Sequence, residues 1–274
     1  MSIYQELGHR TGCAATLLSL GWLLTFGGDY PAGRELVEQS VALYRAEPVI
    51  DRWGLGFALI IAELLATQRG NYAAARMYGK EALALFRELG QPYGISQALN
   101  SLGDIARLQG DYTAAATWYA ESLALLRRST IKGGIPSVLH NMGYVLLAQD
   151  QLQRAAALFA EGLTLQQENG DQQGIAECLA GLAAVAANRQ ESERAARLFG
   201  AVEALRAVTD GPIWPAEQAE YERHRAAACA QLDEATFVAV WAAGRELPLE
   251  QAIVYALEEY ERVYAQAQAP TRCR

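Results

Sequence analysis

Apolar residues recur along the chain in stripes with helical spacing. Between Gly94 and Gln109 they stand at Ile95, Ala98, Leu99, Leu102, Ile105, Ala106 and Leu108. This pattern predicts a helix with one broad buried face. A second stripe follows the turn Gly110-Asp111-Tyr112 and runs to about Arg128, which predicts a second helix. Glycine tolerates the left-handed conformation that ends a helix, and aspartate can cap the next helix.

This two-helix unit repeats with a period of 40 residues. The second helices begin after Gly28, Gly70, Gly110, Asp150 and Gln190, at spacings of 42, 40, 40 and 40. A further glycine series marks the start of every first helix at the same spacings; its members are Gly12, Gly54, Gly94, Gly134 and Gly174. A constant period of two helices predicts an all-α array in which each unit stacks on its neighbours.

Residues at fixed positions of each period resemble the tetratricopeptide-repeat (TPR) family, in its longer form of roughly 40 residues. The third period has the Leu102-Gly103 pair, the Gly110–Tyr112 turn, and then Ala115 and Tyr119. A small residue at Ala115 lets helix axes approach to about 8 Å. The resemblance implies an all-α fold, a right-handed α-solenoid of about five TPR helix pairs.

Glu63 departs from the family pattern. It occupies the position of the tight-packing glycine, which is Gly21, Gly103 and Gly143 in other repeats and Ala183 in the fifth. Because an unpaired buried charge is costly, one interpretation is a carboxylate that turns to solvent or pairs with a nearby arginine. The alternative is a groove acid that holds a basic partner.

The period ends after Asp210, where three further helices are predicted to form a C-terminal cap. They open at about Ala216, after Asp233 and at Pro248. Residues 190–257 resemble the C-terminal end of large bacterial regulators, in which a STAND-type ATPase precedes TPR repeats and many members carry a LuxR-type DNA-binding domain. No GxxxxGK[ST] loop occurs in this chain. The resemblance therefore implies a sensor region without its ATPase.

Four parts of the chain follow from this organisation. Residues 4–12 align with residues 86–94, so residues 1–12 are expected to be the remnant of a preceding repeat's second helix. We expect five TPR-like helix pairs in residues 13–209, a helical cap in residues 210–266 and a disordered tail in residues 267–274.

Composition narrows the class of protein. Hydrophobic residues make up 51%, which suffices for a substantial core. A formal charge of -8 provides no basic field for phosphates, so direct binding of nucleic acid is not expected. No long apolar run or leader pattern suggests a membrane, and a cytoplasmic location is expected.

Motifs for chemistry are missing from the sequence. The three histidines, His9, His140 and His224, stand outside HExxH or other ligand spacings, and the four cysteines have no CxxC pairing. There is no GxSxG motif. We expect no catalytic residue, no metal and no cofactor, and hence a protein that is not an enzyme.

In TPR arrays the first helices of successive repeats line a concave groove, and the family's ligand-facing positions carry over by register. We call these the groove positions: Trp22, Phe57, Leu64, Gln97, Asn100, Asp104, Arg107, His140, Tyr144, Glu177 and Asn188. An amide such as Asn100 offers a donor and an acceptor to an extended peptide. A solvated face is the alternative for Asn100 and Asp104, and inter-repeat core is the alternative for Trp22 and Phe57.

Two functions fit the sequence. The first is a non-enzymatic module that binds a peptide, protein segment or small effector in the groove and serves a bacterial signalling or transcription regulator, with an upstream ATPase or DNA-binding module or its own copy as partner. The alternative is a structural module that oligomerises by stacking through an uncovered N-terminal end. Fold alone does not decide between them.

Overall fold

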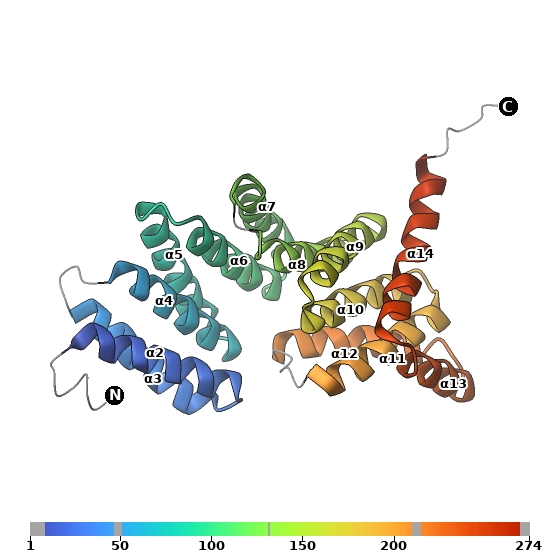
Figure 1. Cartoon of the computed structure of the whole chain (residues 1–274), viewed down its shortest axis with the longest axis horizontal. Helices are drawn as coiled ribbons and strands as arrows, with labels where there is room; N and C mark the ends of the chain where they lie inside the picture. Colours follow the sequence, from blue (N-terminus) through green and yellow to red (C-terminus); the bar gives the residue numbers. More distant parts are fainter. Residues whose placement is uncertain (1–8, 47–50, 131, 210–214, 269–274) are drawn as a thin grey trace. The chain divides into compact units, whose positions relative to one another are not determined.

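The computed structural model describes residues 9–46, 51–130, 132–209 and 215–268. Within these ranges the regular structure is entirely α-helical, with thirteen helices (Figure 1). The chain divides into two compact units, residues 1–134 and 135–274. Residues 1–8 and 269–274 lie outside the described residues, so the remnant helix and the disordered tail remain predictions there. Residues 10–12, expected in the remnant, open the first described helix, and residues 267–268, expected in the tail, end the last one.

Unit 1 contains three helix pairs. Their helices are α2 (Arg10–Phe26) with α3 (Tyr30–Ala46), α4 (Arg52–Gln68) with α5 (Tyr72–Glu88), and α6 (Pro92–Leu108) with α7 (Tyr112–Arg128). Each first helix packs closely on its own second helix, and each second helix packs on the next first helix. Helices α4 and α6 also touch directly. This is the consecutive helix-pair packing of a TPR solenoid.

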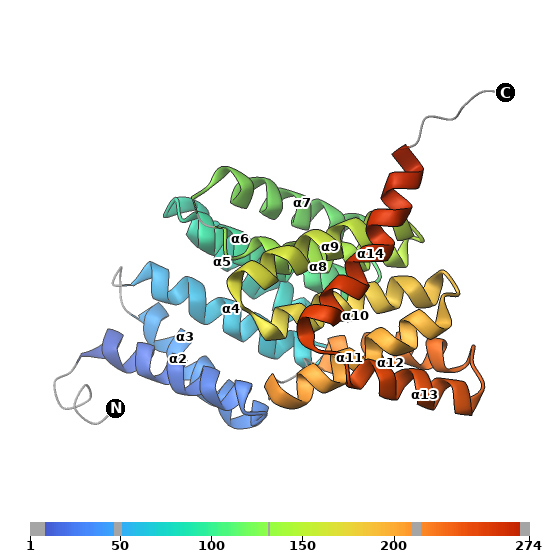
Figure 2. The same cartoon turned by 45° about the vertical axis from the view of Figure 1, so that its right-hand side comes forward.

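Unit 2 contains two further pairs and three C-terminal helices (Figure 2). The pairs are α8 (Ile135–Ala148) with α9 (Leu152–Asn169), and α10 (Gln172–Asn188) with α11 (Ser192–Thr209). Helices α12 (Pro215–Cys229), α13 (Glu234–Arg245) and α14 (Leu249–Gln268) follow. Helix α13 packs along α11, α12 lies on α10 and α11, and α14 touches α9, α10 and α11.

The backbone repeats as the sequence predicts. Gly28, Gly70 and Gly110 have positive φ angles of 87°, 71° and 77° between the helices of their pairs. The equivalent residues of unit 2 are not glycines, yet Asp150 and Gln190 adopt the same left-handed conformation, with φ of 58° and 62°. Such angles are uncommon outside glycine, so the turn geometry is imposed by the packing of the helices on either side.

Within the pairs, a bulky residue of the second helix fills the space beside a glycine of the first. A Cβ atom on Gly103 would overlap the Tyr119 ring, and one on Gly143 would overlap the Phe159 ring. In the second pair the sizes are exchanged. Gly79 takes the place of the aromatic residue, and the Cγ of Glu63 lies 3.7 Å from the position of a Cβ on Gly79. The exchange explains how Glu63 fits at a glycine position.

Glu63 corrects one expectation. Its side chain is only 3% exposed, so it does not turn to solvent. It accepts a hydrogen bond of 2.8 Å from the Thr67 hydroxyl and a second from Ser101, in place of an arginine partner. Burial is the main cause that raises its pKa to about 7. Glu63 is therefore a hydrogen-bonded core acid that is neutral over much of the acidic pH range.

Candidate functional site

The groove positions at the start of unit 1 are apolar and only partly covered. Trp22 is 36% exposed on α2, with its ring 6.2 Å from that of Phe26. Phe57 of α4 is half-buried, in ring contact with Trp53, Phe86 and Tyr93. Phe57 thus belongs partly to the inter-repeat core, whereas Trp22 presents its ring to solvent. Leu64 is half-buried one turn of α4 before Gln68.

The groove positions on α6 are polar. Gln97 and Asn100 are half-buried on one helical face. Asp104 accepts a 2.6 Å hydrogen bond from the Tyr119 hydroxyl of α7, and Arg107 is buried beside them. Burial raises the pKa of Asp104, and the nearby Arg107 guanidinium opposes that rise. Asp104 and Arg107 therefore tie α6 to α7.

In unit 2 the groove positions are brought together beneath α12. His140 and Tyr144 of α8 are both buried, with ring centroids 5.0 Å apart. The Tyr144 ring lies 6.4 Å from the imidazole of His224, which comes from α12. A small hollow here is lined by His140, Tyr144 and Glu177 on one side and by Glu220 and Tyr221 of α12 on the other. Helix α12 therefore covers groove positions of α8 and α10.

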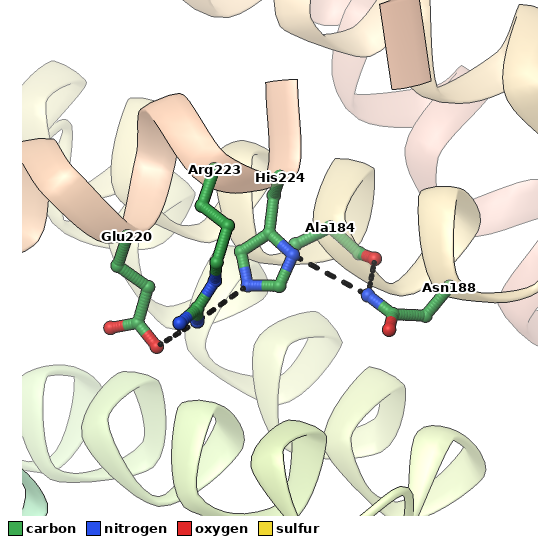
Figure 3. Close-up of polar contacts among 5 residues, drawn as sticks. All are labelled: Ala184, Asn188, Glu220, Arg223 and His224. Carbon is green, nitrogen blue, oxygen red and sulfur yellow. Dashed lines mark hydrogen bonds and ion pairs between the residues drawn. The ribbon is translucent and has the colours of Figure 1, made fainter. Parts of the chain in front are cut away.

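His224 is the polar centre of this contact (Figure 3). Asn188 donates to the Ala184 carbonyl oxygen at 2.8 Å, and its Nδ2 lies 3.4 Å from Nδ1 of His224. On the other side of the ring, Arg223 lies 3.5 Å from Nε2 and pairs with Glu220 at 3.4 Å. Burial, helped by the Arg223 charge, lowers the pKa of His224 to about 4. The imidazole is therefore neutral at neutral pH.

Glu177 and Arg206 complete the polar lining of the hollow below α12. Both are half-buried, and burial raises the pKa of Glu177, with a hydrogen bond from Gln173 opposing the rise. The Arg206 guanidinium stacks 4.2 Å from the centre of the Tyr221 ring. Sequence reasoning missed Arg206, Tyr221 and His224, since they lie outside the first helices. The sequence of α12 holds one signal for two of them, because Tyr221 and His224 form a buried i, i+3, i+7 stripe together with Ala228.

The described residues hold no group of three or more His, Cys, Asp or Glu side chains suited to a metal ion. Cys13 and Cys178 are buried free thiols, and burial raises the pKa of the Cys178 thiol. Among the described helices, none combines the length and apolar character needed to cross a bilayer.

Comparison with known proteins places the repeats. A family model described as tetratricopeptide repeat matches residues 58–128. That range runs from α4 to the end of α7, where the helix pairs and their left-handed turns have just been described. Residues 58–128 therefore carry tetratricopeptide repeats. No curated protein matches the sequence.

Solved structures share the TPR fold at low sequence identity. BtubC (BKLC) from P. vanneervenii is 18% identical with a TM-score of 0.60, over 77% of this chain and 86% of that one. Aspartyl phosphate phosphatase F from Bacillus subtilis is 16% identical with a TM-score of 0.66, over 88% and 61%. The Rap conjugation gene regulator of plasmid pLS20, solved in complex with the Phr* peptide, is 14% identical with a TM-score of 0.56, over 96% and 66%.

Proposed function

We propose that this TPR chain is a non-enzymatic protein-interaction module that holds a peptide or protein segment against the groove positions of unit 1. The proposal rests on one observation in unit 2, where helix α12 covers the groove positions. There the groove positions hold an α-helical segment of the same chain, α12, through Tyr144, Asn188 and His224. The same register in unit 1 presents half-buried Gln97 and Asn100 on α6 and the exposed ring of Trp22 on α2.

The chemistry of unit 1 suits an extended or helical segment with an apolar anchor. Trp22 and Phe57 supply aromatic surface, of the kind that dominates binding energy at interfaces. Gln97 and Asn100 supply amides that can donate to and accept from backbone groups. A similar fold occurs in a regulator solved with a bound peptide, the Rap protein of pLS20. We also propose that the chain works in the cytoplasm as part of, or as a partner of, a bacterial signalling or transcription regulator. A LuxR-type or STAND ATPase module would belong to that regulator.

A peptide selected by phage display on the immobilised full chain tests this proposal. We expect Gln97→Ala combined with Asn100→Ala to weaken its binding at least tenfold by isothermal titration calorimetry. Met77→Ala, on an exposed position of the second helix α5, is the matched control and should bind as the parent does. If the double variant bound the peptide with the same affinity as the parent, Gln97 and Asn100 would not belong to the binding site.

A second candidate function has one specific observation behind it. The outward face of α2 exposes Leu20 at 43%, Leu23 at 64% and Phe26 at 44%. Clustered apolar side chains of this kind mark surfaces that associate. If α2 stacks on another copy, light scattering at about 50 µM should give a dimer mass, and Leu23→Glu should restore the monomer. A monomer at that concentration in the parent chain would count against self-stacking.

A further inference from the structure

Three equivalent grooves lie on the side of the repeats opposite to the groove positions. We call them outer grooves. Each is walled by two successive second helices and floored by the first helix between them. The floors are Ala62, Leu65 and Ala66 of α4, then Leu102, Ile105 and Ala106 of α6, then Leu182, Val185 and Ala186 of α10. At 3.6 residues per turn, Ala62 and Ala66 face away from Phe57 and Leu64.

The third outer groove is occupied by α14. Ala252, Ile253 and Ala256 of that helix are buried, and Ala256 lines the groove directly. Arg194, on the wall formed by α11, donates hydrogen bonds of 2.8 and 3.0 Å to the carbonyl oxygens of Tyr255 and Ala256. The space left in this groove is about 260 Å³, open solvent included. The chain itself therefore shows what an outer groove accepts.

Two features of α14 explain the fit. Ala252 and Ala256 stand one helical turn apart, so the helix presents a shallow strip that lets its backbone approach the floor. Ile253 adds one branched side chain beside that strip. An amphipathic helix with two small residues at i and i+4 is thus the ligand type that this geometry selects.

The first two outer grooves are open in unit 1. Their spaces are about 440 and 520 Å³, against about 260 Å³ where α14 is seated. Tyr78 and Trp118 line their walls half-buried, whereas the residue in register in the fifth pair, Leu198, is fully buried. Half-buried aromatic rings at the wall of an apolar groove are typical anchors for a bound helix.

Two wall positions distinguish the second outer groove from the other two. Its α5 wall carries Arg76 and Lys80, both exposed, and Arg76 donates to the Gln109 side chain across the floor, while the one acidic residue of the lining, Asp111, lies at the start of α7. The first groove has Arg34 and Glu38 at the matching wall positions, so the charges on that wall oppose each other. The third has Ala156 at the position of Arg76. A basic wall favours acidic side chains on the flank of whatever binds there.

We propose that the second outer groove, between α5 and α7, binds an amphipathic helix of a partner protein with two small residues one turn apart and acidic side chains on its flank. The site lies on a different face of α6 from Gln97 and Asn100 and does not depend on the function proposed above. A TPR chain with both sites would hold two segments on opposite faces of one helix pair.

A synthetic peptide with the α14 sequence, residues 249–268, is the probe, because it carries the alanine strip and several glutamates. It is labelled with fluorescein and titrated with the full chain by fluorescence anisotropy. We expect binding in the range of tens of micromolar. Trp118→Ala and Lys80→Glu should each weaken it at least fivefold, and a peptide with Ala252→Trp and Ala256→Trp should not bind.

Two control variants locate the peptide. Arg194→Ala changes the third outer groove alone, and Asn100→Ala changes the groove positions alone. Both should leave the affinity within twofold, and circular dichroism should confirm that every variant is folded. Loss of affinity on Arg194→Ala with none on Trp118→Ala would mean exchange with α14 and overturn the proposal. Loss on Asn100→Ala alone, or no binding at 1 mM chain, would overturn it equally.

Discussion

The two units differ in what lies on their first helices. In unit 2, His140 and Tyr144 are buried beneath α12, and α14 fills the outer groove on the other side. In unit 1, the residues in the same register, Asn100 and Asp104, are half-buried, and the outer grooves are open. The same helix-pair repeat thus occurs with helices packed on both faces in unit 2 and with open grooves in unit 1. The occupants of unit 2 indicate which surfaces of unit 1 are suited to binding.

The largest effect on this contrast should come from loosening the C-terminal helices of unit 2 where α13 packs on α11. A Cβ on Gly244 of α13 would overlap the Arg197 carbonyl oxygen of α11, and backbone cannot yield as a side chain can. We expect Gly244→Ala to lower the free energy of unfolding of unit 2 by about 3 kcal/mol. Hydrogen exchange should show faster exchange in α11 and α13 and unchanged protection in α4–α6.

Gly133→Ala is the matched control, because a Cβ there meets nothing within 4 Å. Its exchange pattern should equal that of the parent. If Gly244→Ala were as stable as Gly133→Ala, the close contact between α11 and α13 would not be needed for the stability of unit 2.

A second, somewhat smaller effect concerns unit 1. Burial raises the pKa of Glu63 from 4.5 to about 7, so the folded chain keeps a proton that the unfolded chain releases between these values. The stability from the protonated acid is therefore full below pH 4.5 and lost as the pH rises to 7. The free energy of unfolding of Glu63→Gln, relative to that of the parent, should therefore rise by about 2 kcal/mol from pH 5 to pH 8. Urea unfolding at the two pH values measures this difference.

Glu168→Gln, at an exposed position of α9, provides the comparison for Glu63→Gln. Its stability relative to the parent should be the same at pH 5 and pH 8. A Glu63 variant with an equally flat difference would mean that this carboxyl is not protonated in the folded chain near neutral pH.

The smallest effect should be the response of α12 to acid. The pKa of His224 is lowered to about 4 in the folded chain, below its ordinary 6.5. Stability from the neutral ring is therefore full above pH 6.5 and declines as the pH falls toward 4. We expect α12 to lose about 1 kcal/mol of docking free energy between pH 7 and pH 5, seen as faster amide exchange in residues 218–229.

His224→Phe keeps a ring against Tyr144 but cannot take up a proton. In this variant the exchange of α12, apart from its ordinary chemical dependence on pH, should not change between pH 7 and pH 5. An acid response as large as in the parent would assign the effect to other groups.

The repeats could be predicted from the sequence because the information is local. Turn residues, apolar stripes and small residues recur at one spacing, and the structure confirms the helix pairs that they predict. The burial of Glu63 could not be predicted from the sequence, because the information is not local. Its burial depends on Gly79, which lies on another helix and leaves the space that an aromatic residue fills in the next pair. A residue preference at a single position of the repeat does not predict an exchange of sizes between two helices.

The groove positions show the same limit. Their places on the first helices follow from register, but what lies on them does not. Helix α12 has only a narrow buried stripe, Tyr221, His224 and Ala228, and its docking depends on a polar contact with Asn188. Asp104 and Arg107 contact Tyr119 of their own pair, which their register alone does not show. Which groove positions touch a ligand stays a prediction.

The left-handed turns of unit 2 have a consequence for how repeat proteins are counted. The family model stops at residue 128, after the last pair whose turn begins with glycine. The backbone conformation continues through Asp150 and Gln190, with two more pairs that end at Thr209. A survey of genomes that recognises repeats by their residue types would assign repeats to only about a quarter of this chain. A census by backbone dihedral angles would follow the array to its end.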